Sequence, residues 1–424
     1  MDNYFSHTID FCRAWLSGQE EFIVHTSGST GAPKPIYVHR AQMQASAHAT
    51  VQALNLQADD TALVCLNTAF IAGKMMLIRG LEVGMNMIVV PPSSKPLEQL
   101  TIINEQLSMT HDQLQISNCE LEISNFQFLV FNKFMIINYL TTVNNQQTIN
   151  YEQRTRSKGT IDFFSFVPLQ ILAILKQSTI NNQQLPINNQ QLSTNNQQAT
   201  TNQKPETINH KLNSAKAIII GGAPVNAELD ALLQTISSPV YATYGMTETV
   251  SHIALKRLNG KEKSPYYQAL PNTILGQDER NCLTIVSSVT NFEKIITNDK
   301  VNLIDETHFE WLGRVDNVIN SGGVKIQIEK VESEIDMALL QLRIFCRFVV
   351  LGLPHNALGE AVTLVLEESD EIKEKEDLLL KINQLTEIKL TKYEKPNSIR
   401  FVSKFPETET NKISRLELWK LLIE

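Results

Sequence analysis

Residues 22–34 of the chain read FIVHTSGSTGAPK, an apolar run followed by a turn rich in hydroxyls and glycine. Gly28 and Gly31 let the backbone curl so that amide groups point inward, and Lys34 adds a positive charge. That combination suits the phosphates of a nucleotide, although it is not the Walker pattern. A turn of this composition is often only a loop, but the final Pro-Lys makes the run more specific. The stretch therefore predicts a phosphate-binding loop at 26–34.

Short apolar runs, each followed by a turn signal, recur farther along the chain. They lie at 62–66, 87–90, 217–220 and 240–244. Runs of this length suit strands that are buried on both faces. Helical patterns, for example at 41–54 and 227–235, lie between them. Strands and helices that alternate in this way predict an α/β fold with mainly parallel sheets.

The composition changes after Trp311. Strand patterns lie at 347–351, 361–366 and 399–402, and a charged helical pattern lies at 375–390. These elements fit a small α+β unit that could fold by itself. We therefore expect an N-terminal domain at 1–315 and a C-terminal domain at 316–424.

Two stretches, near 101–157 and 177–212, are interpreted as inserts. The second is low-complexity, and Asn-Asn-Gln-Gln recurs in it at 181–184, 188–191 and 195–198. The seven-residue spacing does not indicate a coiled coil, because Pro186 would cost about 3 kcal/mol inside a helix. Residues 126–140 are the best membrane candidate, but they are fewer than the ~20 apolar residues of a spanning helix. We expect a buried or poorly structured insert there and no membrane span.

Charge and cysteine content exclude several classes of function. Lys and Arg number 37 and Asp and Glu 45, a net charge of −8. Because the basic residues form no single block, we expect no general nucleic-acid partner. The five cysteines are far apart and form no C-x-x-C pair, so neither a zinc site nor a disulfide framework is indicated. The N-terminus lacks a signal-peptide pattern, and a cytoplasmic location is expected.

Four further motifs carry polar residues beside predicted strands or turns. A double glycine, Gly221-Gly222-Ala223-Pro224, follows a strand at the edge where parallel sheets bind ligands. Residues 244–249, Tyr-Gly-Met-Thr-Glu-Thr, place a glutamate where it could hold Mg²⁺ or simply begin a helix. Residues 313–326 combine Gly-Arg with a second double glycine and also fit a β-hairpin. Residues 411–415, Asn-Lys-Ile-Ser-Arg, contain a lysine that alone would be an ordinary surface charge.

In this order the five motifs resemble those of the adenylate-forming superfamily, which contains acyl-CoA ligases, peptide-synthetase adenylation domains and luciferases. They span residues 24–415 apart from the inserts. The resemblance implies a large N-terminal domain, a hinge and a small mobile C-terminal domain. It also implies two half-reactions. A carboxylate attacks the α-phosphate of ATP to give an acyl-adenylate and pyrophosphate, and the thiol of coenzyme A then displaces AMP.

The resemblance also implies a nucleotide site, position by position. Asp299 would hold the ribose hydroxyls, and Arg314 would assist it. The adenine pocket would be lined by Gly221, Gly222, Ala223, Pro224 and Tyr244. The mobile phosphate loop would include Thr26, Ser27, Gly28, Ser29, Thr30, Gly31 and Lys34.

Catalysis would depend on residues from both domains. Thr247 would contact the α-phosphate and Glu248 would bind Mg²⁺. Asp316 would be the hinge, and Gly323 would lie along the tunnel for coenzyme A. Lys412 would bridge the carboxylate and the α-phosphate, where a cation offsets the repulsion between two anions.

The chain departs from the superfamily pattern in three places. Asn298 and Asn411 stand where glycine is usual, and asparagine tolerates positive φ better than most residues. Only 25 residues precede the phosphate loop, whereas most members have well over a hundred. We therefore expect a reduced acceptor pocket.

Within the superfamily, residues 70–79 and 244–255 most resemble the o-succinylbenzoate–CoA ligases of menaquinone biosynthesis. Such a substrate keeps a second carboxylate after activation, which favours cationic or hydroxyl partners. The candidates are Lys74, Arg79, Ser251 and His252. A packed histidine and two charges on a helix surface are the alternative interpretations.

Two other functions stay open at this stage. The chain could be a ligase or adenylation enzyme for another aryl or fatty acid. It could also be an inactive relative that serves as a binding or scaffold protein, although Lys34, Glu248, Asp299, Arg314 and Lys412 are all present. The oligomeric state is not indicated by the sequence.

Overall fold

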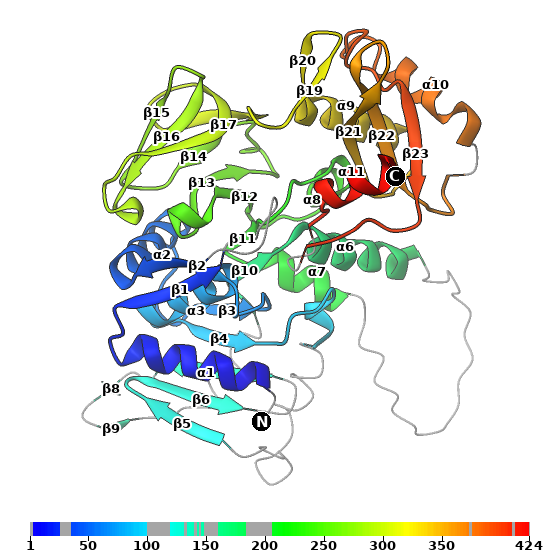
Figure 1. The fold of residues 1–424 in the computed structure, drawn as a ribbon. Helices are drawn as coiled ribbons and strands as arrows, with labels where there is room; N and C mark the ends of the chain where they lie inside the picture. Colours follow the sequence, from blue (N-terminus) through cyan, green and yellow to red (C-terminus); the bar gives the residue numbers. More distant parts are fainter. Residues whose placement is uncertain are drawn as a thin grey trace, which may run out of the picture.

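The protein is described by a computed structural model. A 14-stranded sheet with helices on both faces forms the larger part, and a separate five-stranded sheet lies in the C-terminal part (Figure 1). The described residues are 3–25, 35–99, 119–130, 134–139, 142–143, 146–147, 160–183, 206–372, 375–408 and 412–423.

Five parallel strands form the middle of the large sheet, in the order β4-β3-β10-β11-β12. Every residue of β10 and β11 is buried, which is typical of strands covered on both faces. The sequence analysis expected strands at four of these positions, and β10 is an addition. The strands are β3 (Thr61–Val64), β4 (Asn86–Val89), β10 (Phe163–Phe166), β11 (Ala217–Ile220) and β12 (Val240–Gly245).

Antiparallel strands continue the sheet beyond β12, in the order β13-β14-β18-β17-β16-β15. The α/β fold is thus confirmed, but the sheet is mixed and its parallel part is limited to the five central strands. Short connections join β15, β16, β17 and β18 in turn, and strands joined in this way pair antiparallel. The strands are β13 (His252–Arg257), β14 (Tyr267–Ala269), β15 (Thr273–Gln277), β16 (Cys282–Ser287), β17 (Ile295–Leu303) and β18 (His308–Arg314).

Three more antiparallel strands extend the opposite edge, next to β4. They are β5 (Cys119–Ile123), β6 (Phe126–Val130) and β7 (Met135–Tyr139), and β7 pairs with β4. These strands lie inside the first predicted insert, and Phe128 and Phe134 are fully buried. This part of the insert therefore belongs to the core, and the described residues of the 126–140 membrane candidate form β6 and β7 rather than a helix. The insert boundaries, 101–157 and 177–212, stay predictions.

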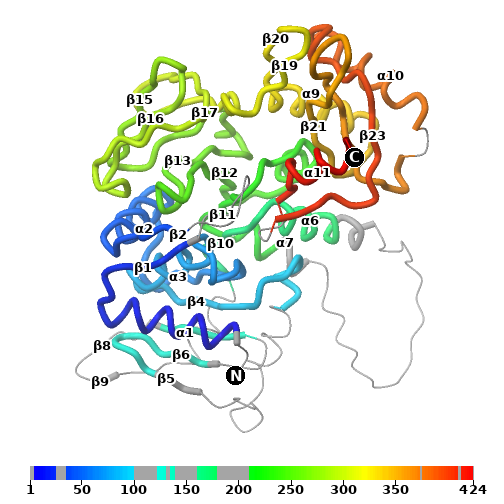
Figure 2. The backbone as a smooth tube through the Cα atoms, viewed as in Figure 1, coloured from blue at the N-terminus to red at the C-terminus, as the bar shows by residue number. Residues whose placement is uncertain are grey.

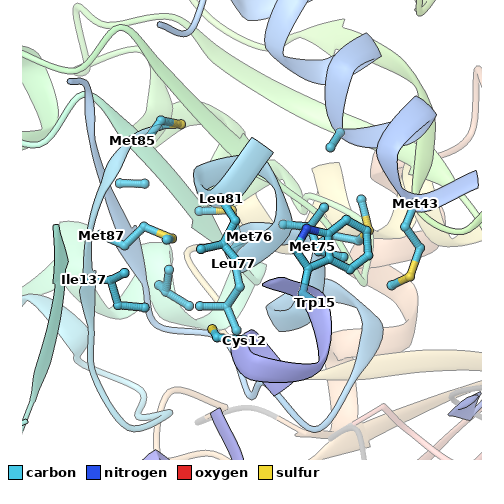
Figure 3. Close-up of a cluster of buried hydrophobic side chains, with 14 of the residues drawn as sticks. Cys12, Trp15, Met43, Met75, Met76, Leu77, Leu81, Met85, Met87 and Ile137 are labelled. Atoms are coloured by element: carbon cyan, nitrogen blue, oxygen red, sulfur yellow. The ribbon is translucent and has the colours of Figure 1, made fainter. Parts of the chain in front are cut away.

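Helices cover both faces of the parallel strands, and the strand residues alternate between the two cores. Phe163 packs in a cluster with α1, α2 and α3, whereas Phe164 and Phe166 pack with α6, α7 and α8. Figure 3 shows part of the first cluster, to which α1 contributes Trp15 and α3 contributes Met75. The helices are α1 (Asn3–Leu16), α2 (Arg40–Leu54), α3 (Ile71–Val83), α6 (Pro168–Gln183), α7 (Glu206–Asn213) and α8 (Ala227–Leu233).

The last hundred residues have their own sheet and core, drawn from yellow to red in Figure 2. This arrangement matches the small α+β unit expected there, and the exact domain boundary stays a prediction. The strands are β19 (Val318–Ser321), β20 (Val324–Gln327), β21 (Phe348–His355), β22 (Gly359–Glu367) and β23 (Ser398–Val402). The helices are α9 (Ile328–Gln341), α10 (Lys375–Leu385) and α11 (Arg415–Ile423).

Helix α9 and the loop after it contact the larger part. The Asp336 carboxylate of α9 accepts a hydrogen bond from the Ala227 amide at the start of α8, at 2.5 Å. Lys176 of α6 lies 5.3 Å from the ring centre of Phe345 and pairs with Glu228 at 2.7 Å. Because α8 begins just after residues 221–224, the C-terminal part rests beside the predicted adenine loop.

Among the described helices, none is both long and apolar enough to cross a membrane. Cys12, Cys65, Cys282 and Cys346, the cysteines whose side chains the structure describes, are free thiols.

The core position of β6 can be tested by mutation. Phe128→Ala should lower the free energy of unfolding by about 3–5 kcal/mol, because it leaves a cavity in a packed cluster. Urea denaturation measures the change. Ile388→Ala is the control, since that side chain is 96% exposed. Equal effects of the two substitutions would mean that β6 does not belong to the core.

Candidate active site

The predicted phosphate loop joins two strands that pair antiparallel. They are β1 (Glu21–His25) and β2 (Pro35–His39), and His25 is paired with Pro35. The register therefore brings the two ends of the 26–34 segment together. The candidates Thr26, Ser27, Gly28, Ser29, Thr30, Gly31 and Lys34 lie outside the described residues.

The double glycine at 221–222 lies where β11 and β12 end side by side. A β-carbon on Gly221 would lie 2.4 Å from Thr243 Oγ1, so a larger residue there would have to displace that hydroxyl. Gly222 has a φ of +87°, in the left-handed region that favours glycine. Since Ile220 is paired with Ala242, residues 221–224 and Tyr244 emerge at the same edge of the sheet. Their role as an adenine pocket stays a prediction.

Asp299, the predicted ribose ligand, is held by two donors. The Tyr244 hydroxyl donates to Oδ2 at 2.7 Å, and the Trp311 indole donates to Oδ1 at 3.2 Å. Burial, followed by the nearby Asp299 charge, raises the pKa of Tyr244 far above its usual range, so its hydroxyl stays protonated. Each carboxylate oxygen has two lone pairs, so both can still accept from ribose hydroxyls. Trp311 is a contact that the motifs did not reveal.

Arg314 connects the predicted ribose ligand to the predicted hinge. Its Nε and Nη2 donate to the two oxygens of Asp316 at 2.8 and 2.7 Å, and its Nη1 lies 4.0 Å from Asp299. The Asn298 amide also donates to Asp316, at 3.2 Å. Hydrogen bonds from Arg314 hold the pKa of the Asp316 carboxyl below its usual range. Asn298, one of the departures from the superfamily pattern, therefore contacts the hinge residue directly.

Thr247 and Glu248 lie on a short 3-10 turn, η1 (Thr247–Thr249), just past β12. Thr247 is half-buried and Glu248 is exposed. The next residue, Val250, has a φ of +62°, which strains a β-branched side chain. Its amide hydrogen-bonds to the Thr247 carbonyl at 2.9 Å, which holds this conformation. Strained backbone residues of this kind cluster at active sites.

Three of the four candidates for a second carboxylate come together. Arg79 Nη2 donates to Ser251 Oγ at 3.1 Å, and Ser251 Oγ lies 3.4 Å from His252 Nδ1. Arg79 is 2% exposed, so it is not the helix-surface charge of the alternative interpretation. Burial, followed by the Arg79 charge, holds the pKa of His252 well below its usual value. The imidazole is therefore neutral at pH 7.

Lys74 lies elsewhere. Its ammonium donates to the Ile23 carbonyl of β1 at 3.5 Å and sits 5.6 Å from the ring centre of Phe11. Burial lowers its pKa from the usual lysine value. Lys74 therefore contacts the strand that leads into the predicted phosphate loop and does not join the Arg79 cluster.

A cavity of about 230 Å³ adjoins the cluster through His252. Ser46 of α2 lies in its wall, and in the described part of the chain Ser46 Oγ has no hydrogen-bond partner. The other lining residues are uncharged or apolar apart from His48, and include Ala45, Ala49, Ile253, Leu270 and Val289.

Gly323 and Lys412 lie in the C-terminal part. Gly322 and Gly323 form the turn of the β19–β20 hairpin with φ values of +59° and +83°, as expected for a two-residue hairpin turn. Lys412 is half-buried next to a bridge between Glu407 and Ile413, and burial lowers its pKa from the usual lysine value. The tunnel and bridging roles of these residues stay predictions.

Comparison with known proteins identifies the family. The family model for AMP-binding enzymes matches residues 19–111. A solved acyl-CoA synthetase (AMP-forming)/AMP-acid ligase II-like protein from Dyadobacter fermentans is 33% identical; the match covers 99% of this chain and 95% of that one, with a TM-score of 0.52. The chain belongs to the AMP-forming acyl-CoA synthetases. It is thus an AMP-forming carboxylate–CoA ligase, and enzymes of this family use ATP and coenzyme A.

Two less similar relatives of this synthetase are both named as o-succinylbenzoate (2-succinylbenzoate) ligases. The 2-succinylbenzoate–CoA ligase of Bacillus cytotoxicus is 22% identical over 96% of this chain and 72% of its own length. The o-succinylbenzoate CoA synthetase of Bacillus subtilis, solved with its acyl-adenylate intermediate, is 18% identical; the match covers 93% of this chain and 68% of that one, with a TM-score of 0.59. This second likeness shows a common fold.

The turn at Gly245 offers a test of the site geometry. A β-carbon on Gly245 would lie 2.3 Å from the Ser251 carbonyl oxygen and 2.5 Å from His252 Cα. Gly245→Ala should therefore displace the Thr-Glu turn and lower the rate of ATP–pyrophosphate exchange by at least about tenfold, the cost of roughly 1.4 kcal/mol. Gly276→Ala is the control, since only the Thr284 hydroxyl is close. An unchanged exchange rate in Gly245→Ala would contradict this geometry.

Proposed function

We propose that this AMP-forming ligase activates o-succinylbenzoate and transfers it to coenzyme A, as a step of menaquinone biosynthesis in the cytoplasm. The observation that carries the proposal is the buried Arg79 guanidinium. Its hydrogen bond goes to the Ser251 hydroxyl, and no described carboxylate pairs with it. The likeness to 2-succinylbenzoate–CoA ligases supports this choice of acid.

Burying a cation without an opposite charge lowers the stability of the fold, because the protein interior solvates charge less well than water does. Burial lowers the pKa of Arg79 to about 9, which still leaves it charged at neutral pH. An acid that keeps a second carboxylate after activation would supply the missing negative charge and form a bidentate pair. A mono-acid would leave Arg79 unpaired. The arrangement therefore favours a dicarboxylic substrate.

The proposed roles at the reacting end follow from the family chemistry. The substrate carboxylate is already ionised at pH 7, so its attack on the α-phosphate needs no general base. Thr247 would contact the α-phosphate, and Lys412 would offset the repulsion between the two anions. Asp299 and Arg314 would hold the ribose, while Gly221, Gly222, Ala223, Pro224 and Tyr244 would enclose the adenine. The 26–34 loop would hold the outgoing pyrophosphate.

Glu248 is the proposed ligand of Mg²⁺. Its carboxylate is exposed beside the Thr247 hydroxyl, and oxygen donors of this kind suit a hard cation. The ion, when bound, would neutralise charge that develops on the phosphates. Thr247 and Glu248 can share this task because η1 presents both at the end of β12.

The second half-reaction would need the C-terminal domain to turn about Asp316, so that Gly323 can lie along the path of coenzyme A. The Arg314–Asp316 pair joins the ribose site to this hinge. Domain closure and rotation of this kind often control access to an active site. A ligase for another aryl or fatty acid is the alternative function.

The function is tested by coenzyme A thioester formation with ATP and Mg²⁺ across a panel of carboxylic acids. We expect o-succinylbenzoate to be the best substrate. Arg79→Gln should raise its KM by about 10- to 100-fold, as expected for loss of a charged hydrogen bond. Arg257→Gln is the control, because Arg257 stacks on Tyr241 instead.

Turnover of a different acid, together with no turnover of o-succinylbenzoate, would contradict the proposed substrate. No pyrophosphate release with any acid would instead favour an inactive relative that acts as a binding protein. An equal effect of Arg79→Gln and Arg257→Gln would remove Arg79 from substrate binding.

The two-conformation mechanism is tested at Lys412. Lys412→Ala should abolish adenylate formation, because the cation between the two anions is lost, yet thioester formation from supplied acyl-adenylate should persist. Pyrophosphate release and thioester formation are measured separately. Lys404→Ala is the control, since Lys404 is an exposed lysine of the same region. Equal loss of both half-reactions would contradict two conformations.

A further inference from the structure

A chain of hydrogen bonds links Arg79 to helix α2. Arg79 Nη2 contacts Ser251 Oγ at 3.1 Å, Ser251 Oγ lies 3.4 Å from His252 Nδ1, and His252 Nε2 lies 3.0 Å from Thr50 Oγ1. Thr50 Oγ1 in turn donates to the Ser46 carbonyl at 3.0 Å. Thr50 and His252 are 0% and 7% exposed. The chain therefore joins α3, β13 and α2 in a buried environment.

The chemistry of the groups sets the direction of each hydrogen bond. Thr50 has one hydroxyl hydrogen, and the Ser46 carbonyl, which can only accept, takes it. Thr50 therefore accepts from His252 Nε2, and the neutral imidazole must be unprotonated at Nδ1. Nδ1 then accepts the Ser251 hydroxyl hydrogen. Ser251 Oγ is left with its lone pairs directed at Arg79, which can only donate.

The orientation of Arg79 depends on this arrangement. In the described part of the chain its side chain hydrogen-bonds to Ser251, and its buried Nε has no partner. If the Ser251 hydroxyl rotated, its hydrogen would face the guanidinium and the contact would become repulsive. A long arginine side chain also loses much conformational freedom when it is held in one rotamer. The group that fixes the orientation of the Ser251 hydroxyl thus also fixes the rotamer of Arg79.

We propose that Thr50 and His252 are positioning residues that hold Arg79, through Ser251, in the rotamer that binds the second carboxylate of the substrate. In this proposal His252 acts through Ser251, whereas its place in the sequence predicted a direct contact with the substrate. Thr50 lies on α2, 202 residues before His252 in the sequence, and belongs to none of the motifs. This inference rests on the proposed function of Arg79.

The decisive experiment replaces Thr50 by valine, which keeps the shape but removes the acceptor for His252. KM for the acid that the wild-type enzyme turns over best should rise about fivefold, the worth of one hydrogen bond. KM for ATP should stay unchanged. KM for an accepted monocarboxylate analogue, in which hydrogen replaces the second carboxylate, should also stay unchanged. Thr50→Ser, which restores the hydroxyl, should return KM for the acid to the wild-type value.

Thr386→Val is the matched control. Thr386 is 1% exposed and donates to the Ile382 carbonyl at 2.9 Å in the same way as Thr50, but lies in the C-terminal part. If Thr50→Val raises KM for ATP and for both acids alike, its effect is structural and the proposal fails. The proposal also fails if Thr50→Val leaves all three KM values unchanged, or if Thr50→Ser does not restore the acid KM.

The Arg79→Gln variant separates this inference from the proposed function. If Arg79→Gln raises KM for the diacid and Thr50→Val does not, Arg79 binds the carboxylate and only the positioning role is overturned. If the wild-type enzyme has the same KM for each diacid and for its monocarboxylate analogue, the proposed function itself fails. His252→Gln should reproduce Thr50→Val, and the double variant should show less than the product of the two effects, because the residues act through one chain.

Discussion

Burial of the central strands on both faces is the constraint on which the rest of the structure depends. β10 and β11 expose no residue, so helices must cover both sides of the sheet. Parallel strands with helical connections end at one edge, where residues 221–224 and 244–248 emerge as loops. The packed core thus brings these polar loops together although they are not adjacent in the sequence. The candidate catalytic residues can remain exposed there because a packed sheet supports the loops that carry them.

The site itself combines well-paired and poorly paired charges. Asp299 and Asp316 receive several donors, so their positions are set before any ligand arrives. Arg79 is the opposite case, a buried cation with one neutral partner. Removing charge from water without an opposite charge lowers stability, and active sites tolerate such a cost where a ligand will compensate it. The contrast separates the residues proposed to bind the nucleotide from those proposed to bind the acyl group.

Local patterns predicted much of the fold and part of the site. Apolar runs at 62–66, 87–90, 217–220 and 240–244 became strands, since a continuous run can be buried on both faces. β10 was missed because Ser165 interrupts its short aromatic run, and β5–β7 were taken for an insert because their surroundings are polar. Trp311 and Thr50 carry no motif, and their importance comes from contacts with residues far away in sequence.

The sequence by itself determined the family and the order of its motifs, because these depend on short stretches of neighbouring residues. Only the tertiary structure decided which charges are buried and which are paired. Arg79 and Lys74 look alike in sequence as two cations on one helix, yet one meets Ser251 and the other meets Ile23. The reason is geometric: helix α3 turns its side chains toward different neighbours, and burial arises from packing between distant segments.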